Sequence, residues 1–153
     1  MPELIETELD TTMNNQAINP SINTDINQWT VLVVDDEQDT LVVVERILRF
    51  YGAQVYTARN GELGLSIINT IEPTFVLLDL SMPKMDGWAM VSAMRGNPDS
   101  AHLPVIALSG APIEGERDRL FEAGFDGFIA KPFRMKTFIE QIQDILQPFT
   151  VSG

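Results

Sequence analysis

The chain of 153 residues is long enough for one globular domain plus a short extension, and its apolar content of 44% is ordinary for such a domain. It has no cysteine and one histidine, which excludes disulfides, thiolate zinc sites and imidazole-rich metal centres and makes the cytoplasm the expected location. The net charge of −12 argues against direct nucleic-acid binding, and no apolar run approaches the roughly 18 residues of a membrane span.

Residues 1–28 differ in composition from the rest of the chain. They contain five acidic residues, no Lys or Arg, and no sustained hydrophobic periodicity. A segment of this kind cannot bury enough apolar surface to order itself, so we expect an acidic, disordered N-terminal arm. A short helix over Pro2–Leu9 that docks on a partner is the alternative. The first residues lack a basic region, so no signal peptide is expected.

From Trp29 onward, strands and helices alternate. Short apolar runs bounded by turn residues predict five strands, at Thr30–Val34, Gln54–Thr57, Phe75–Leu78, Val105–Leu108 and Gly127–Ala130. Helical spacing predicts five helices, at about Asp39–Tyr51, Gly61–Ile71, Gly87–Arg95, Glu114–Ala123 and Lys136–Leu146. In the second helix we expect Leu63, Leu65 and Ile68 to be buried.

The alternation of elements predicts an α/β fold. Near-continuous apolar strands are typical of a parallel sheet that is covered on both faces. We therefore expect a flavodoxin-like, doubly wound, five-stranded parallel sheet with strand order 2-1-3-4-5 and five helices. This domain should span residues 29–149 and leave a tail at 150–153. Since only seven residues follow Leu146, we expect no output domain.

Polar side chains follow four of the predicted strands. Asp35 and Asp36 come after the first strand, Asp79 after the third, Ser109 after the fourth and Lys131 after the fifth. The carboxyl ends of parallel strands meet at one edge of a sheet, so these side chains should converge there. Three carboxylates, a hydroxyl and an ammonium group would suit a divalent cation, an acceptor carboxylate and a phosphoryl group.

The adjacent acids Asp35 and Asp36 predict a metal site. Like charges so close repel each other, and a pair in a crevice usually needs a cation. The alternative is a helix N-cap followed by a first-turn acid, which explains one aspartate but not two that face Asp79. Because the ligands are oxygens and few in number, Mg²⁺ or Mn²⁺ is the expected ion.

Asp79 is the predicted nucleophile. It ends a wholly apolar strand, where an ionised carboxylate costs several kcal/mol unless a cation or a lysine compensates it. A carboxylate can attack phosphorus to give an acyl phosphate. Ser109 offers a hydrogen-bond donor to a phosphoryl oxygen, and Lys131 offers a positive charge. Either residue alone would more often be structural, so their joint placement is the informative observation.

Four segments of the chain resemble the receiver domains of two-component response regulators. They are Val-Val-Asp-Asp-Glu at 33–37, Leu-Asp-Leu-Ser-Met-Pro-Lys-Met-Asp-Gly at 78–87, Ala-Leu-Ser-Gly at 107–110 and Lys-Pro-Phe at 131–133. The resemblance implies that Asp79 is the phosphoacceptor. It also implies that Asp36, Asp79 and the Ser81 backbone carbonyl ligate Mg²⁺, with Asp35 acting partly through water and Mn²⁺ able to substitute.

The same resemblance assigns roles in switching. Ser109 takes the place of the switch hydroxyl, Phe128 that of the switch aromatic, and Lys131 that of the lysine that pairs with the phosphoryl group. The alternative for Phe128 is an ordinary core residue near a strand end. Gly110 departs from the commoner alanine after the switch hydroxyl and leaves that loop less constrained.

The function implied by the resemblance is that of a single-domain response regulator in a phosphorelay. A histidine kinase or histidine phosphotransfer protein would donate a phosphoryl group to Asp79. The domain would then change its affinity for a downstream protein or form a phosphorylation-dependent homodimer, with no direct contact to nucleic acid or membrane. It would not be an enzyme, although it would assist its own phosphorylation and dephosphorylation.

Three other functions fit the sequence less well. A haloacid-dehalogenase-like phosphatase also uses an aspartyl phosphate and Mg²⁺, but it wants a second acid two residues after the nucleophile, where this chain has Ser81. A nucleotide-binding protein needs a glycine-rich phosphate loop, and neither common form occurs. A pseudo-receiver that acts only as a scaffold remains an alternative, although the acids, Ser109 and Lys131 are all present.

Overall fold

A computed structural model describes residues 22–82, 84–110 and 115–150. Its centre is a five-stranded sheet built from β2 (Thr30–Val34), β3 (Gln54–Ala58), β4 (Phe75–Asp79), β5 (Val105–Ser109) and β6 (Gly127–Ala130). The strands lie in the order β3-β2-β4-β5-β6, and all neighbours are parallel. This order is the predicted 2-1-3-4-5, so the flavodoxin-like fold is confirmed.

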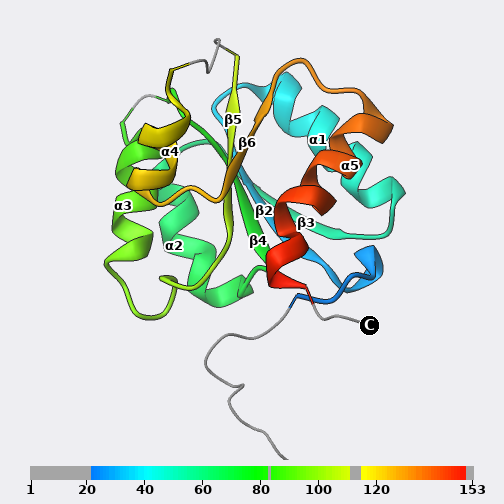
Figure 1. Ribbon diagram of the computed structural model, residues 1–153, viewed down its shortest axis with the longest axis horizontal. Coiled ribbons are helices and arrows are strands. Elements are labelled where there is room, and N and C mark those ends of the chain that lie inside the picture. Colours follow the sequence, from blue (N-terminus) through cyan, green and yellow to red (C-terminus); the bar gives the residue numbers. More distant parts are fainter. Residues whose placement is uncertain (1–21, 83, 111–114, 151–153) are drawn as a thin grey trace, which may run out of the picture.

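Helices cover both faces of the sheet. In the described part of the chain they are α1 (Gln38–Phe50), α2 (Gly61–Ile71), α3 (Gly87–Arg95), α4 (Arg117–Ala123) and α5 (Met135–Leu146). Helices α1 and α5 lie on one face, and α2, α3 and α4 lie on the other (Figure 1). Among the described residues, no helix is both long and apolar enough to cross a membrane.

Strand β2 illustrates why the sheet is apolar on both faces. Val31 and Val33 belong to the core beneath α1 and α5, whereas Leu32 and Val34 belong to the core beneath α2, α3 and α4. All four side chains are fully buried. Since successive residues of a strand point to opposite faces, a strand that is covered twice must be apolar throughout.

Helix α2 packs through small residues, which corrects one expectation from the sequence. Ile68 is buried as predicted, but Leu63 is 46% exposed. The buried face instead includes Gly64, where an added Cβ atom would lie 3.0 Å from Val34 and 2.9 Å from Met90. The glycine therefore lets the helix backbone approach the sheet closely, and the helix turns Leu63 towards solvent.

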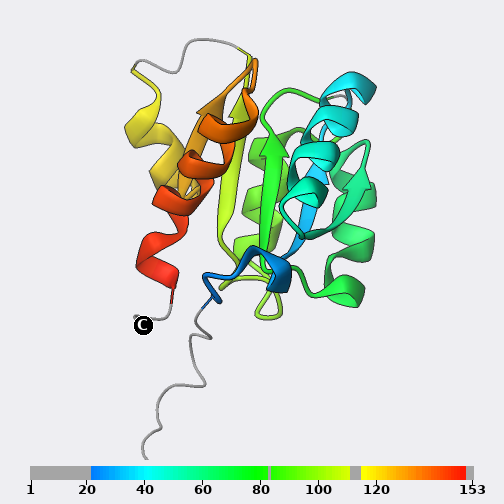
Figure 2. The same cartoon turned by 90° about the vertical axis from the view of Figure 1, so that its right-hand side faces the viewer.

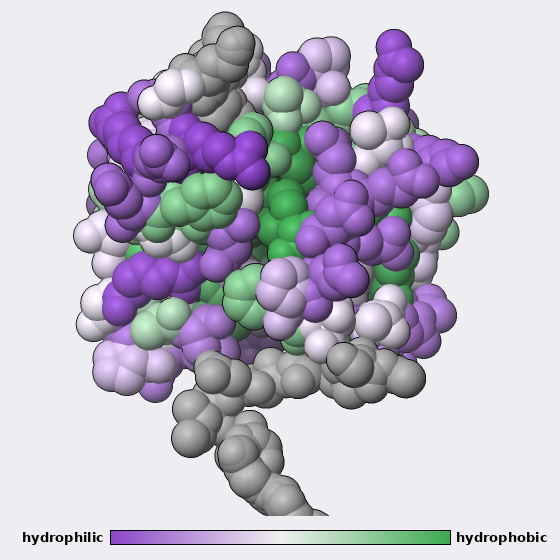
Figure 3. Space-filling view, in the orientation of Figure 1, coloured by the Kyte–Doolittle hydropathy of each residue, from purple (hydrophilic) through white to green (hydrophobic). Residues whose placement is uncertain are grey.

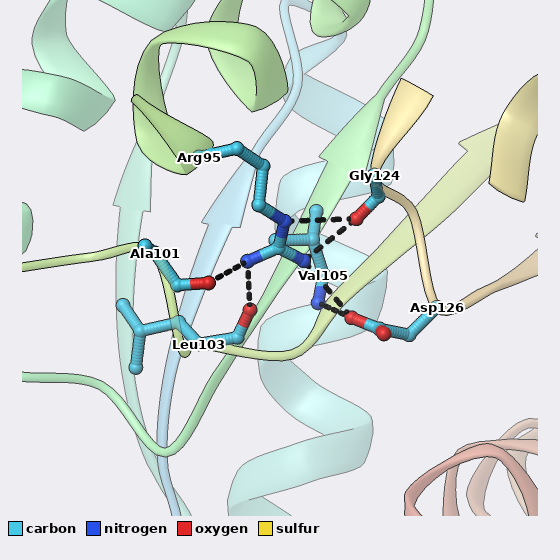
Figure 4. A network of polar contacts seen from close by, with 6 residues as sticks. All are labelled: Arg95, Ala101, Leu103, Val105, Gly124 and Asp126. Carbon is cyan, nitrogen blue, oxygen red and sulfur yellow. Dashed lines mark hydrogen bonds and ion pairs between the residues drawn. The ribbon is translucent and has the colours of Figure 1, made fainter. Parts of the chain in front are cut away.

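The C-terminal end of α4 is fixed by an arginine from α3 (Figure 4). The Arg95 guanidinium donates hydrogen bonds to three backbone carbonyl oxygens, those of Ala101, Leu103 and Gly124. It also pairs with the Asp126 carboxylate at 3.1 Å, and that carboxylate accepts a hydrogen bond from the first amide of β5. These contacts join the ends of α3 and α4 to the start of β5.

Part of the predicted N-terminal arm packs on the domain. Ile22 is buried, and its backbone amide donates a 2.7 Å hydrogen bond to the Phe149 carbonyl. Trp29 is buried edge-on against Phe75, with ring centroids 5.1 Å apart. The expectation of disorder through residue 28 is therefore wrong for residues 22–28, because Ile22 anchors the segment to the core. The expectations for residues 1–21 and 151–153 lie outside the described residues.

The segment 22–29 and the end of α5 lie at the same pole of the molecule (Figure 2). A short bridge between Ile22 and Thr150 joins them. This pole is opposite the carboxyl ends of the strands, so the packed N-terminal segment lies away from the predicted site.

Candidate functional site

The predicted site residues converge at the carboxyl edge of the sheet. Asp35 follows the last residue of β2, Asp79 and Ser109 end β4 and β5, and Lys131 follows the last residue of β6. In the sheet register Asp79 pairs with Leu108, one residue before Ser109. The parallel register therefore brings four separate parts of the chain to one place.

Asp35, Asp36 and Asp79 form an acidic cluster. One carboxylate oxygen from each lies within 4.8 Å of the others. The Asp35 and Asp79 side chains are buried, whereas Asp36 is exposed. Carboxylate oxygens at this spacing fit the preference of Mg²⁺ for oxygen ligands.

Lys131 partly offsets this negative charge. Its Nζ atom lies 2.9 Å from Asp35 Oδ2, 2.9 Å from Glu37 Oε1 and 3.6 Å from Asp79 Oδ1. Burial alone would lower the pKa of Lys131, but its interactions with Glu37, Asp35 and Asp79 outweigh burial and raise that pKa. The ammonium group is therefore firmly protonated and is shared by three carboxylates.

The Asp79 carboxylate is unfavourable in its ionised form. Burial, together with the nearby Asp35 charge, raises the pKa of Asp79 from its ordinary 3.8 to about 7. The charge of Lys131 and a hydrogen bond from the Ser81 backbone act in the opposite direction, but they do not cancel the effect. A divalent cation beside the carboxylate would favour its ionised form.

The start of α3 lies close against the end of β4. Asp86 caps α3, its side chain accepting a hydrogen bond from the amide of Ala89. Next to it, a Cβ atom added to Gly87 would collide with the carbonyl oxygen of Asp79. Only glycine allows this approach, so Gly87 brings the first turn of α3 next to the strand end that carries Asp79.

An open cleft of about 630 Å³ lies over these residues. It is lined by predicted site residues, among them Asp36, Asp79, Ser81, Ser109 and Lys131. The cleft is therefore large enough for a phosphoryl group beside the three carboxylates.

The cleft is also lined by residues that the sequence did not assign to the site, among them Glu37, Trp88 and Glu116. The Arg119 guanidinium lies over the Trp88 ring, 4.5 Å from its centroid, and forms a 3.0 Å ion pair with Glu116. Glu37 could have been noticed because it directly follows the two acids. Trp88 lies in α3 and Glu116 directly precedes α4, and no local sequence pattern predicts how these two helices pack around the cleft.

Phe128 lies on β6, half-buried beside α4. Its ring packs against the core beneath α2, α3 and α4, and the Arg117 guanidinium lies 5.8 Å from its centroid. Phe128 is therefore neither fully buried in the core nor fully exposed on the surface. Its position on the strand beside Ser109 is compatible with either of the roles considered from the sequence.

Comparison with known proteins identifies the class. The sequence model of the response regulator receiver domain matches residues 31–143, which is most of the chain. The fold is the one that the resemblance implied. The chain belongs to the response regulator receiver domain family.

Particular relatives agree with this assignment. The "probable transcriptional regulator ycf27" of Cyanophora paradoxa is 34% identical over 123 residues, which are 80% of this chain and 50% of that protein. An uncharacterized 14.6 kDa protein of Leptolyngbya boryana is 32% identical over 122 residues, 80% of this chain and 93% of that protein. The chain spans about half the length of the first curated relatives that it matches.

Solved structures show the same likeness. The chemotaxis protein CheY4 of Vibrio cholerae superposes with a TM-score of 0.72 at 26% sequence identity, covering 76% of this chain and 98% of that protein. The predicted family and fold are thus confirmed by both sequence and structure.

Proposed function

We propose that this receiver domain accepts a phosphoryl group on Asp79 in a Mg²⁺-dependent reaction and thereby changes its affinity for a protein partner. The proposal rests on the environment of the Asp79 carboxylate. It is buried at the end of an apolar strand, its pKa is raised to about 7, and it lies 3.6 Å from the Lys131 ammonium. A carboxylate in this setting gains from both a divalent cation and a nearby lysine.

The reaction is an in-line displacement at phosphorus. An Asp79 carboxylate oxygen forms the new O–P bond while the P–N bond to a donor histidine breaks, and the electron pair leaves with the imidazole nitrogen. Lys131 would bind one phosphoryl oxygen, and the Ser109 hydroxyl would donate to another. Positioning and charge neutralisation supply most of the catalysis in such transfers.

Three oxygen donors would hold the metal directly: the carboxylates of Asp36 and Asp79 and the backbone carbonyl of Ser81. Asp35 would act partly through water, and Mn²⁺ would substitute for Mg²⁺. When bound, the ion would supply positive charge against the phosphoryl oxygens. The close spacing of the carboxylate oxygens in the acidic cluster supports this part of the proposal.

The switch would act through the face that contains β6. A hydrogen bond from Ser109 to the phosphoryl group would shift the start of the loop that leads to α4, and Phe128 would turn further inward. Figure 3 shows an apolar strip at the centre of this face, flanked by hydrophilic surface, in the region where β6 runs between α4 and α5 in Figure 1. This strip is the surface that we propose for phosphorylation-dependent binding of a partner or a second copy.

The donor would be a histidine kinase or a histidine phosphotransfer protein, as family membership favours. The protein would be an acceptor rather than an enzyme, because it is itself the substrate that becomes modified. A cytoplasmic location would follow, since such donors draw their phosphoryl groups from ATP.

A phosphotransfer panel tests the proposal. The wild-type protein and Asp79→Asn are incubated with radiolabelled candidate histidine kinases and Mg²⁺, and the transferred label is measured at short times. We expect at least one donor to label the wild type and none to label the variant. Equal labelling of the two proteins would contradict the proposed acceptor.

A further inference from the structure

Lys131 makes its shortest contacts with residues other than the proposed phosphoacceptor. Its Nζ atom donates a 2.9 Å hydrogen bond to Glu37 Oε1 and lies 2.9 Å from Asp35 Oδ2. The distance to Asp79 Oδ1 is longer, 3.6 Å. In the unphosphorylated protein the ammonium group is therefore drawn towards the α1 side of the cleft.

Glu37 is held in place although its side chain is 61% exposed. Its Oε1 atom also accepts a 3.1 Å hydrogen bond from the Thr40 hydroxyl. Its backbone amide donates a 2.9 Å hydrogen bond to Asp35 Oδ1, and Glu37 is the N-cap residue that directly precedes α1. The contact is an oriented ion pair rather than an accidental meeting of two surface side chains.

We propose that Glu37 is a positioning residue that holds Lys131 in the unphosphorylated state and thereby slows the loading of Asp79. The inference rests on the proposed phosphoryl transfer. An interaction that is stronger in the starting state than in the transition state reduces the rate. As charge gathers on the phosphoryl oxygens, Lys131 must turn from Glu37 towards them. Its contact with Glu37 is therefore stronger in the starting state than in the transition state.

The step involves no proton on Glu37 or Lys131. With acetyl phosphate as donor, an Asp79 oxygen forms a bond to phosphorus, the P–O bond of the donor breaks, and its electron pair leaves with acetate. Lys131 stays protonated throughout and exchanges one carboxylate partner for a phosphoryl oxygen. The change at Glu37 is the loss of an ion pair.

The test compares three variants with the wild type. Glu37→Gln keeps the size of the side chain and removes its charge. Thr40→Val keeps the Glu37 charge and removes the hydroxyl that orients it. Asp39→Asn is the matched control, because it removes the same charge from an exposed side chain in the first turn of the same helix. Each protein is phosphorylated with acetyl phosphate and Mg²⁺ over a range of donor concentrations, and beryllofluoride binding is measured by calorimetry.

We expect Glu37→Gln to raise the rate at saturating donor, and the beryllofluoride affinity, by about two- to five-fold, the range of an exposed ion pair. Thr40→Val should give a smaller rise in the same direction. Asp39→Asn should leave the saturating rate unchanged, since long-range repulsion of an anionic donor acts mainly on its apparent KM. If Glu37→Gln does not fold, the rise in Thr40→Val carries the test.

Several results would overturn the inference. A rate in Glu37→Gln at or below that of wild type would show that the ion pair does not restrain loading. An equal rise of the saturating rate in Asp39→Asn would show that removing any nearby negative charge speeds phosphorylation. If the wild type itself takes up no phosphoryl group, the proposed function fails and the inference falls with it. If the wild type takes up a phosphoryl group but the rate rises in neither Glu37→Gln nor Thr40→Val, the inference is wrong while the proposed function stands.

Discussion

The backbone amide of Lys131 donates a 2.8 Å hydrogen bond to the carbonyl oxygen of Ser109. The two residues that we expect to bind phosphoryl oxygens are thus joined through their backbones, at the ends of neighbouring strands. Ser109 also pairs with Ala130 in the sheet register. A displacement of Ser109 would therefore be transmitted to Lys131 and along β6 to Phe128.

Ser109→Ala should separate phosphorylation from switching. We expect the variant to accept a phosphoryl group from acetyl phosphate but to lose phosphorylation-dependent binding, because the hydroxyl that would draw the loop inward is gone. A population shift of a few kcal/mol is enough to change partner affinity substantially. Backbone amide shifts on adding beryllofluoride measure the change at Phe128 and along α4 and α5.

Ser100→Ala is the control for this experiment. Ser100 is also buried, and its hydroxyl donates a 2.8 Å hydrogen bond to the Met94 carbonyl, away from the proposed site. The control should keep the beryllofluoride-dependent shifts at Phe128. If the wild-type shifts stay within the loops of Asp35, Asp79 and Lys131, the proposed switch does not operate.

Mg²⁺ should stabilise the wild-type protein. Asp35, Asp36 and Asp79 crowd negative charge that a divalent ion relieves, so binding adds about 2.7 kcal/mol at an ion concentration roughly 100 times the Kd. Asp36→Ala should abolish the rise in Tm while leaving the metal-free protein no less stable, because one repulsive charge is removed. Differential scanning calorimetry with and without Mg²⁺ measures both effects. Equal shifts in wild type and Asp36→Ala would mean that the ion binds elsewhere.

The raised pKa of Asp79 predicts a pH dependence of stability in EDTA. The pKa is about 7 in the folded state and 3.8 ordinarily, so between these values the folded state holds a proton that the unfolded state has lost. The stabilising effect of protonated Asp79 is complete below pH 3.8 and is lost as the pH rises through 7. Relative to Asp79→Asn, the wild type should lose up to about 1.4 kcal/mol per pH unit across this window.

Urea unfolding of both proteins at several pH values measures this difference. Comparison with Asp79→Asn cancels the titration of the other carboxylates, which the two proteins share. A constant difference across the window would show that Asp79 titrates at its ordinary pKa.

Arg95 should be important for stability. Arg95→Gln removes an arginine whose hydrogen bonds hold the ends of α3 and α4, and leaves the Asp126 carboxylate without its ion pair. We expect a loss of roughly 2–4 kcal/mol in the free energy of unfolding. Arg119→Gln is the control, since its ion pair with Glu116 is exposed and should contribute less than about 1 kcal/mol. Equal losses in the two variants would show that the Arg95 contacts contribute little.

The sheet and the acidic cluster could be predicted because both depend on local patterns. Phe75–Leu78 is apolar throughout and ends at Asp79, which marks a strand buried on both faces and its polar end. Once the strands are parallel, their carboxyl ends coincide, and residues distant in sequence come together without further information.

The features that could not be predicted depend on tertiary packing. The exposure of Leu63 follows from the close approach of Gly64 to the sheet, which helical spacing does not reveal. The burial of Ile22 requires the Phe149 carbonyl, at the other end of the chain. The pairing of Glu37 with Lys131 joins a helix start to a strand end, and neither residue alone signals it.

The most direct test of the account is the mass of the intact protein after brief treatment with acetyl phosphate. Wild type, Asp79→Asn and Asp36→Ala are treated with and without Mg²⁺ and analysed at once by mass spectrometry. The account predicts that the wild type gains one phosphoryl group only when Mg²⁺ is present and that neither variant gains any. A phosphoryl group on Asp79→Asn, or uptake by the wild type in EDTA, would contradict the assignment of Asp79 as the Mg²⁺-dependent acceptor.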